Sequence, residues 1–130
     1  MTNLNYRCQF AIYSFFILLQ IIVVDGDTLN INHERIRLIG IDAPEMMGHC
    51  RQGRVCVKGN PHRSKASLQS IVNRGGSVKI VRRGYDRYGR TLASVSIGTT
   101  NLSCHQIRTH NAVYVPRWDR TKIISNSCNL

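Results

Sequence analysis

VVDGDTLNINHERIRLIGIDAPE, residues 23–45, holds the strand and turn signals that decide the fold. With the residues just before it, LQIIVVDGDTLNIN (19–32) predicts two strands joined at the Asp25–Gly26 turn signal. RIRLIGI (35–41) predicts a third strand. The chain must turn before Pro44, because the residue preceding a proline is disfavoured in the helical region.

The rest of the chain predicts two more strands and two helices. A helix is expected to start at Asn60–Pro61, an N-cap residue followed by proline at the first helical position, and to end at Gly75–Gly76. The later segments are predicted as follows: strands at SVKIVRR (77–83) and TLASVSI (91–97), a turn at GYDRYGR (84–90), a weaker helix at NLSCHQIRTHN (101–111), and a short extended piece at AVYV (112–115).

These elements predict an α+β, mainly β fold: a five-stranded OB-type Greek-key barrel with two packed helices. The expected domain covers residues 21–119, and 130 residues suit one hydrophobic core. Residues 120–130 are expected to form a short irregular tail. The C-terminal helix is therefore expected to be truncated.

Residues 1–20 form a hydrophobic N-terminal segment that resembles a secretory signal or an uncleaved membrane anchor. A buried N-terminal strand is the alternative, because no small-residue cleavage site follows and the end of the apolar run is needed for the first strand. Export (secreted or periplasmic) or membrane tethering is expected, and a cytoplasmic location stays open.

The chain is strongly basic, with 18 Lys and Arg against 7 Asp and Glu, a net charge of +11 and a pI of about 10.1. This excess favours a polyanionic partner: nucleic acid first and an anionic membrane surface second. A basic surface that only confers solubility is the alternative.

Five of the seven acidic residues nevertheless lie in residues 23–45, and four of them flank the two strands: Asp25, Asp27, Asp42 and Glu45. Carboxylates that meet at one barrel rim repel one another and need a hard cation such as Ca²⁺ or Mg²⁺. Asp25 is expected to serve the turn rather than the ion, and a purely structural role for all these turn and loop residues is the alternative.

Arg37 and Arg90 add a second kind of chemistry. A guanidinium beside a cation matches phosphate with two parallel hydrogen bonds and can stabilise a phosphorane, while Glu45 can position or deprotonate the attacking water. Arg35, two residues from Arg37, is interpreted as an exposed strand charge. Tyr88, Tyr114 and Trp118 are candidates for stacking on bases, with a core role for Trp118 as the alternative.

In order and spacing, DGDT, RIRLIGIDAPE and DRYGRTLA resemble the staphylococcal nuclease family, from about Ile22 to about Asp119. The resemblance implies an OB barrel and a calcium-dependent nuclease, a metal-dependent phosphodiesterase that cuts DNA and RNA, single strands preferred, with little base specificity. The roles that it implies are these: Asp27, Asp42 and the carbonyl of Ala43 as Ca²⁺ ligands; Glu45 as general base; Arg37 and Arg90 on the scissile phosphate; Arg87 and Tyr88 on a terminal phosphate. We expect a monomer. A non-catalytic nucleic-acid-binding OB module and a truncated inactive relative are the alternatives.

The loop after Glu45 departs from this pattern, with Cys50 and Cys56 in GHCRQGRVC (48–56). If the domain is exported, the two cysteines are expected to form a disulfide. A metal site that adds His49 and His62 to the two cysteines is an alternative, as are two reduced thiols. The basic run RQGRVCVKGNPHRSK (51–65) is interpreted either as a phosphate-tracking surface or as a solvated face.

Overall fold

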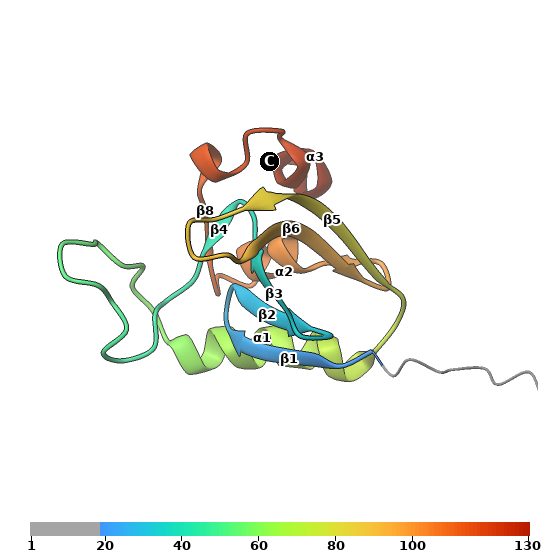
Figure 1. Cartoon of the computed structure of the whole chain (residues 1–130), viewed down its shortest axis with the longest axis horizontal. Helices are drawn as coiled ribbons and strands as arrows, with labels where there is room; N and C mark the ends of the chain where they lie inside the picture. The colour runs from blue at the N-terminus through green and yellow to red at the C-terminus, as the bar shows by residue number, and fades with distance from the viewer. Residues whose placement is uncertain (1–18) are drawn as a thin grey trace, which may run out of the picture.

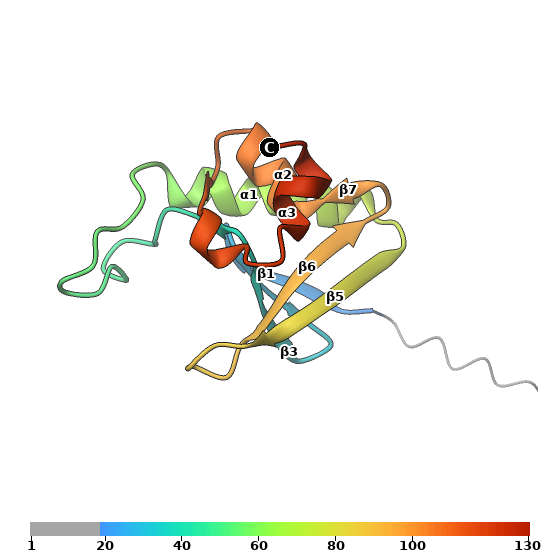
Figure 2. The same cartoon turned by 90° about the horizontal axis from the view of Figure 1, so that it is seen from above.

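The computed structural model describes residues 19–130, and the predicted N-terminal signal or anchor lies almost wholly outside them. The strands are β1 (Ile21–Asp25), β2 (Thr28–Ile31), β3 (Glu34–Leu38), β4 (Ile41–Asp42), β5 (Val78–Tyr85), β6 (Thr91–Ile97), β7 (Thr100–Asn101) and β8 (Val113–Tyr114). The helices are α1 (Pro61–Arg74), α2 (Leu102–Arg108), the short 3-10 helix η1 (Pro116–Trp118) and α3 (Ile123–Cys128). Figure 2 shows the three α-helices on one side of the strands, and in the view of Figure 1 α1 lies at the bottom and α3 at the top. No helix among the described residues is long and apolar enough to cross a membrane.

The main sheet is mixed and runs in the order β1-β2-β3-β6-β5, with the short β7 paired to β6. Neighbouring strands are antiparallel except β3 and β6, which are parallel. This mainly β arrangement is consistent with an OB-type fold. The ladders of residues 19–130 include no β1–β5 pairing that would close a barrel.

The predicted third strand, residues 35–41, is divided into β3 and β4. The break falls at Gly40, whose φ is 77°. A Cβ added at Gly40 would lie 3.0 Å from the Ile124 side chain. β4 then pairs with β8 in a separate two-stranded sheet, which places Asp42 opposite Val113. The main sheet thus has six strands rather than five, because β7 joins it, and β4 and β8 lie outside it in the second sheet.

The predicted start of α1 is confirmed. The Asn60 side chain accepts hydrogen bonds from the backbone N–H groups of His62 and Arg63, and so satisfies two donors at the helix start. Leu68 and Ile71 are buried on the face that packs against the sheet. Gly75 follows the last turn at a φ of 73°, a conformation that glycine adopts without strain.

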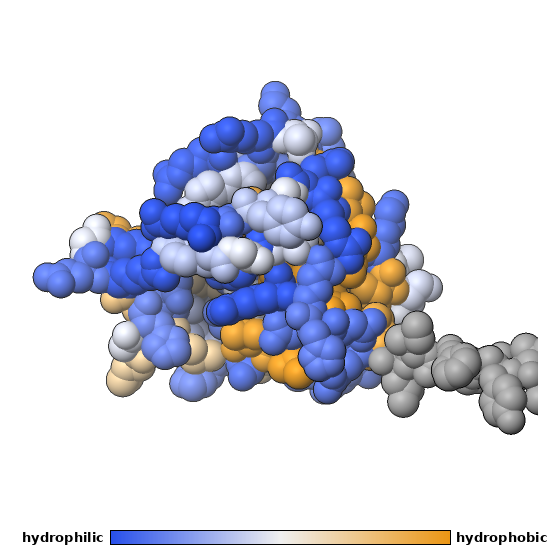
Figure 3. All heavy atoms as spheres, in the orientation of Figure 1, coloured by the Kyte–Doolittle hydropathy of each residue, from blue (hydrophilic) through white to orange (hydrophobic). Residues whose placement is uncertain are grey.

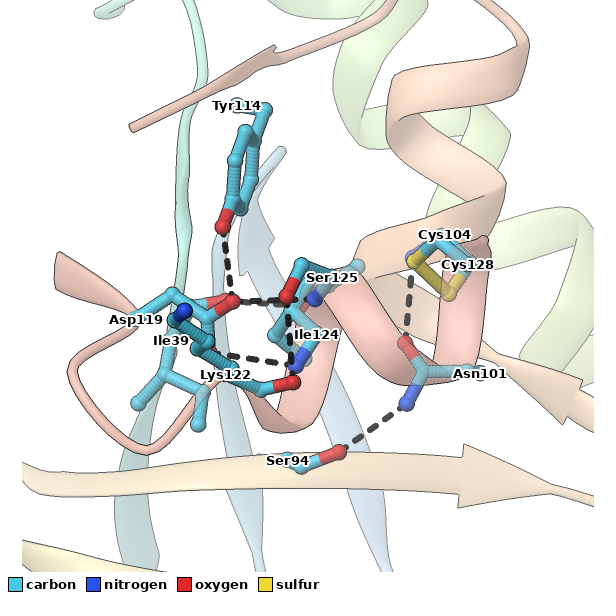
Figure 4. The surroundings of a disulfide bond; sticks show 11 residues. Ile39, Ser94, Asn101, Cys104, Tyr114, Asp119, Lys122, Ile124, Ser125 and Cys128 are labelled. Carbon is cyan, nitrogen blue, oxygen red and sulfur yellow. Dashed lines mark hydrogen bonds between the residues drawn. A yellow bond between two sulfur atoms is a disulfide. The ribbon is translucent and has the colours of Figure 1, made fainter. Parts of the chain in front are cut away.

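The C-terminal segment is not the irregular tail that the sequence predicts. Residues 123–128 form α3, which the disulfide Cys104–Cys128 joins to α2. Asp119 accepts hydrogen bonds from the N–H groups of Ile124 and Ser125 and from the Tyr114 hydroxyl, as Figure 4 shows. A disulfide and a buried carboxylate thus hold a six-residue helix that has too little apolar surface to pack stably alone.

The core lies between the sheet and the helices. Its fully buried side chains include Leu29, Ile36, Leu38, Leu68 and Leu102. A smaller cluster, in which Ile124 packs with Ile39 and the Cys104–Cys128 pair, lies under α3. α3 therefore lies where the sequence predicts an irregular tail.

Candidate active site

The turn between β1 and β2 is fixed by close contacts with α1 and α2. A Cβ on Gly26 would lie 1.8 Å from Ser64 Oγ on α1, so only glycine fits there. Gln106 of α2, fully buried, donates from Nε2 to the Gly26 carbonyl at 2.8 Å and to the Ser64 carbonyl at 2.9 Å. Asp25 Oδ1 accepts from the Asp27 N–H at 3.0 Å, so Asp25 serves the turn. The residue that follows, Asp27, is held in one place.

Asp27 is buried and its carboxylate is partly neutralised by neighbours. Its Oδ2 accepts from the Ala43 N–H at 2.8 Å and lies 3.1 Å from Arg37 Nη2. Burial raises the pKa of Asp27 to about 7, although the Arg37 guanidinium acts against that rise. A further cation beside this carboxyl would favour its charged form.

Arg37 links the turn to the end of β4. Its Nη2 also lies 3.6 Å from Asp42 Oδ1, and its Nη1 donates to the Leu38 carbonyl at 3.1 Å. The Trp118 ring lies 5.5 Å from the guanidinium carbon and covers it from η1. Only 11% of the Arg37 side chain is exposed, so its position is fixed by packing as well as by charge.

Asp42 and Glu45 complete the cluster on the chain that leaves β4. Both are bound by Arg54, which the sequence did not single out. Arg54 Nη2 donates to Asp42 Oδ1 and Oδ2 at 2.9 and 3.0 Å, and Nη1 donates to Glu45 Oε1 at 2.9 Å. The structure thus brings Asp27, Arg37, Asp42 and Glu45 into one connected group, in which Arg54 links Asp42 to Glu45.

Asp27 and Asp42 are two buried carboxylates, both within reach of Arg37, and carboxylate oxygens are the ligands that hard divalent cations take. Among residues 19–130, however, no group of three or more His, Cys, Asp or Glu side chains is arranged to hold a metal ion. An ion held here would take two side-chain carboxylates, Asp27 and Asp42, and would need the Ala43 carbonyl, water or substrate oxygens as well.

The DRYGR turn forms a second basic group. Asp86 organises it by accepting from the Tyr88 and Arg90 N–H groups at 2.9 Å and from Arg90 Nε at 2.7 Å. The guanidinium groups of Arg87 and Arg90 lie 5.0 and 5.6 Å from the Tyr88 ring centre. Arg90 precedes Thr91, which lies opposite Ile36 on β3, so the turn emerges beside the strand that carries Arg37.

The Tyr114 hydroxyl has a structural partner that the sequence did not predict, whereas the two loop cysteines form the predicted disulfide. The Tyr114 hydroxyl donates to Asp119 Oδ2 at 2.8 Å, which gives Tyr114 a structural role in holding the C-terminal segment. Cys50 and Cys56 form a disulfide, so they offer no thiolates for the alternative metal site with His49 and His62. Arg35 is exposed, as expected.

Sequence reasoning missed Arg54, Gln106 and Asp119. Arg54 had a signal, because it lies in the basic run between the two loop cysteines. Gln106 and Asp119 had none, since a buried glutamine or aspartate is recognised only by the partners that the fold supplies.

The comparisons with known proteins agree with the motifs. The family model described as "Staphylococcal nuclease homologue" matches residues 35–125. The chain is 32% identical over 115 residues to "Thermonuclease" of Staphylococcus intermedius, covering 78% of this chain and 62% of that protein. It is 34% identical over 68 residues to "Succinoglycan biosynthesis protein ExoI" of Rhizobium meliloti (strain 1021), covering 52% of this chain and 36% of that protein. The chain therefore spans less than two thirds of either relative.

Proposed function

Because this chain belongs to the staphylococcal nuclease family, we propose that it is a calcium-dependent nuclease whose reaction centre is the group Asp27, Arg37, Asp42 and Glu45. The observation that carries the proposal is the position of Arg37, which reaches both buried carboxylates through one nitrogen. A protein that only bound polyanions would gain nothing from carboxylates beside its basic residues, because they repel phosphate.

In this proposal, Asp27, Asp42 and the Ala43 carbonyl hold Ca²⁺, which supplies positive charge to the phosphate oxygens when it is bound. Arg37 donates to a nonbridging oxygen of the phosphodiester. Its rigid packing lowers the cost of orienting that donor, because little side-chain freedom remains to be lost. Trp118 keeps water from one side of the guanidinium, which strengthens its interaction with phosphate.

Glu45 is proposed as the general base. It lies three residues beyond Asp42, and 23% of its side chain is exposed, so a water molecule can reach it. Arg90 is proposed as the second donor to the developing phosphorane, and Arg87 and Tyr88 as contacts to a terminal phosphate. Tyr114 retains a substrate role only through its ring, since its hydroxyl is bonded to Asp119.

The substrates we propose are DNA and RNA, with single strands preferred and little base specificity. The net charge of +11 favours polyanions. The face shown in Figure 3 is covered largely by hydrophilic residues, which suits contact with a sugar–phosphate backbone. We also propose an exported or membrane-tethered monomer, and the two disulfides of the described residues support an oxidising compartment.

The test is hydrolysis of single-stranded DNA with Ca²⁺ by the full chain and by three variants. Glu45→Gln and Arg37→Gln are expected to lower kcat by at least about 100-fold each, because general-base and charge-stabilising groups contribute effects of that size. Arg35→Gln is the matched control, since it removes the same charge from an exposed position on the same strand. Equal loss in all three variants would indicate general electrostatic binding instead, the behaviour of a non-catalytic OB module.

A further inference from the structure

Arg54 bridges two carboxylates of the proposed reaction centre. Its guanidinium donates three hydrogen bonds of 2.9–3.0 Å to Asp42 and Glu45, the proposed ligand and the proposed base. These are the oxygens that must be free for an ion and for a water molecule. A residue that holds both must leave before the proposed reaction can begin.

The loop around Arg54 is built to place this side chain. Cys50 and Cys56 close it covalently, and inside the ring the Arg54 N–H donates to the Arg51 carbonyl at 3.0 Å. Gly53, the third residue of that turn, has a φ of 81°, which glycine adopts without strain. The turn fixes two arginines at its ends: Arg54 on the carboxylates, and Arg51 with its guanidinium carbon 4.2 Å from the Tyr88 ring centre.

The two arginines on Asp42 differ in how firmly they are held. Arg37 is 11% exposed and Arg54 is 37% exposed. Arg54 lies on a loop whose neighbours His49, Gln52 and Val55 are all exposed, so its side chain can swing into solvent without disturbing the core. The Arg54 guanidinium can therefore leave Asp42, whereas the Arg37 guanidinium stays in place.

We propose that Arg54 is an internal counter-cation of the metal site, which holds Asp42 and Glu45 until a divalent ion displaces its guanidinium. This inference rests on the proposed function, since it assumes that the ion binds at Asp42. One positive group replaces another on the same oxygens, so the two compete directly. The Cys50–Cys56 ring keeps the displaced side chain close, and the arginine returns when the ion leaves.

The test is calorimetric titration of the full chain with CaCl2 alone, comparing wild type, Arg54→Gln and Arg51→Gln. Arg51→Gln removes the same charge from the same disulfide ring, three residues away, without touching the carboxylates. Arg54→Gln is expected to bind Ca²⁺ more tightly than both other proteins, by up to about fivefold, because a competing ion pair of this exposure contributes up to about a factor of five.

The rate of tryptic cleavage gives a second measurement, which does not require a Ca²⁺ dissociation constant. Cleavage after Arg54, detected by mass spectrometry after reduction of the disulfide, is expected to accelerate in wild type when Ca²⁺ is added. Cleavage after Arg51 is expected to change less. The cleavage rate after Arg54 reports directly whether this side chain is bound to the carboxylates or free in solvent.

Equal Ca²⁺ affinity in wild type and Arg54→Gln, equal gains in both variants, or no binding by any of the three would overturn the inference. Binding by Arg54→Gln alone would support it. Tighter binding in Arg54→Gln without DNA hydrolysis would remove the nuclease proposal and leave the role of Arg54 intact. Calcium-dependent hydrolysis with unchanged affinity would remove only the role of Arg54.

Discussion

The disulfide Cys104–Cys128 is expected to determine whether the C-terminal segment stays folded, and the variant Cys104→Ala/Cys128→Ala tests this. The bond joins α2 to α3 across 24 residues of sequence. α3 has only six residues and buries Ile124 as its one large apolar side chain. Such a short helix is not stable by itself, so the covalent link and the Asp119 hydrogen bonds are what hold it.

The magnitude follows from the loop that the bond closes. In the chain-entropy treatment, a loop of about 25 residues removes unfolded-state entropy equivalent to about 3.5 kcal/mol at 25 °C. That is a large part of the 5–15 kcal/mol typical of a small domain. The ring Cys50–Cys56, with a separation of 6 residues, gives about 2.4 kcal/mol by the same relation.

The assay is urea unfolding of the wild type and of each double alanine variant, followed by the fluorescence of Trp118, the single tryptophan. Removing Cys104–Cys128 is expected to lower the free energy of unfolding by about 3–4 kcal/mol, and to speed hydrogen exchange at residues 123–128. The variant without Cys50–Cys56 is the control, with a smaller loss and unchanged exchange in α3. A loss below about 1 kcal/mol for Cys104–Cys128 would contradict a large stabilising role for this disulfide.

Three further substitutions test the rest of the scaffold. Gly26→Ala is expected to cost about 1–3 kcal/mol or more in urea unfolding, because its Cβ would overlap Ser64; a neutral effect would mean that α1 packs more loosely than described. Asn60→Ala is expected to lower the free energy of unfolding by about 1 kcal/mol through loss of the α1 cap, and an unchanged value would show that water replaces it. Hydrogen bonds from Arg82 lower the pKa of Glu34 to about 2 from an ordinary value of 4.5, so this carboxylate stabilises the fold above about pH 4.5 and loses that contribution as pH falls toward 2. Glu34→Gln should therefore flatten the acid limb of the stability curve measured by thermal unfolding, and an identical limb would contradict the assignment.

The strands and the start of α1 could be predicted because their signals are local. β-Branched runs, the Asp25–Gly26 turn and the Asn60–Pro61 cap act through neighbouring residues, and each was found at its expected place. The proximity of Asp27, Arg37 and Asp42 could also be predicted from the sequence, because strand ends meet at one rim of a small sheet.

The C-terminal helix and the Arg54 contacts could not be predicted, because both depend on groups far apart in sequence. Five cysteines allow many pairings, and spacing alone does not select Cys104–Cys128. The break at Gly40 depends on Ile124, which packs against it from α3. Arg54 is one of several basic residues in its loop, and only the folded loop directs it to Asp42.

The most direct test of the central claim is the calcium dependence of single-stranded DNA hydrolysis by the purified full chain. We expect hydrolysis with Ca²⁺, none in excess EGTA, and full recovery when Ca²⁺ is restored. Undiminished hydrolysis in EGTA, or no hydrolysis with Ca²⁺, Mg²⁺ or Mn²⁺ by a sample shown to be folded, would contradict a reaction centre built on Asp27 and Asp42.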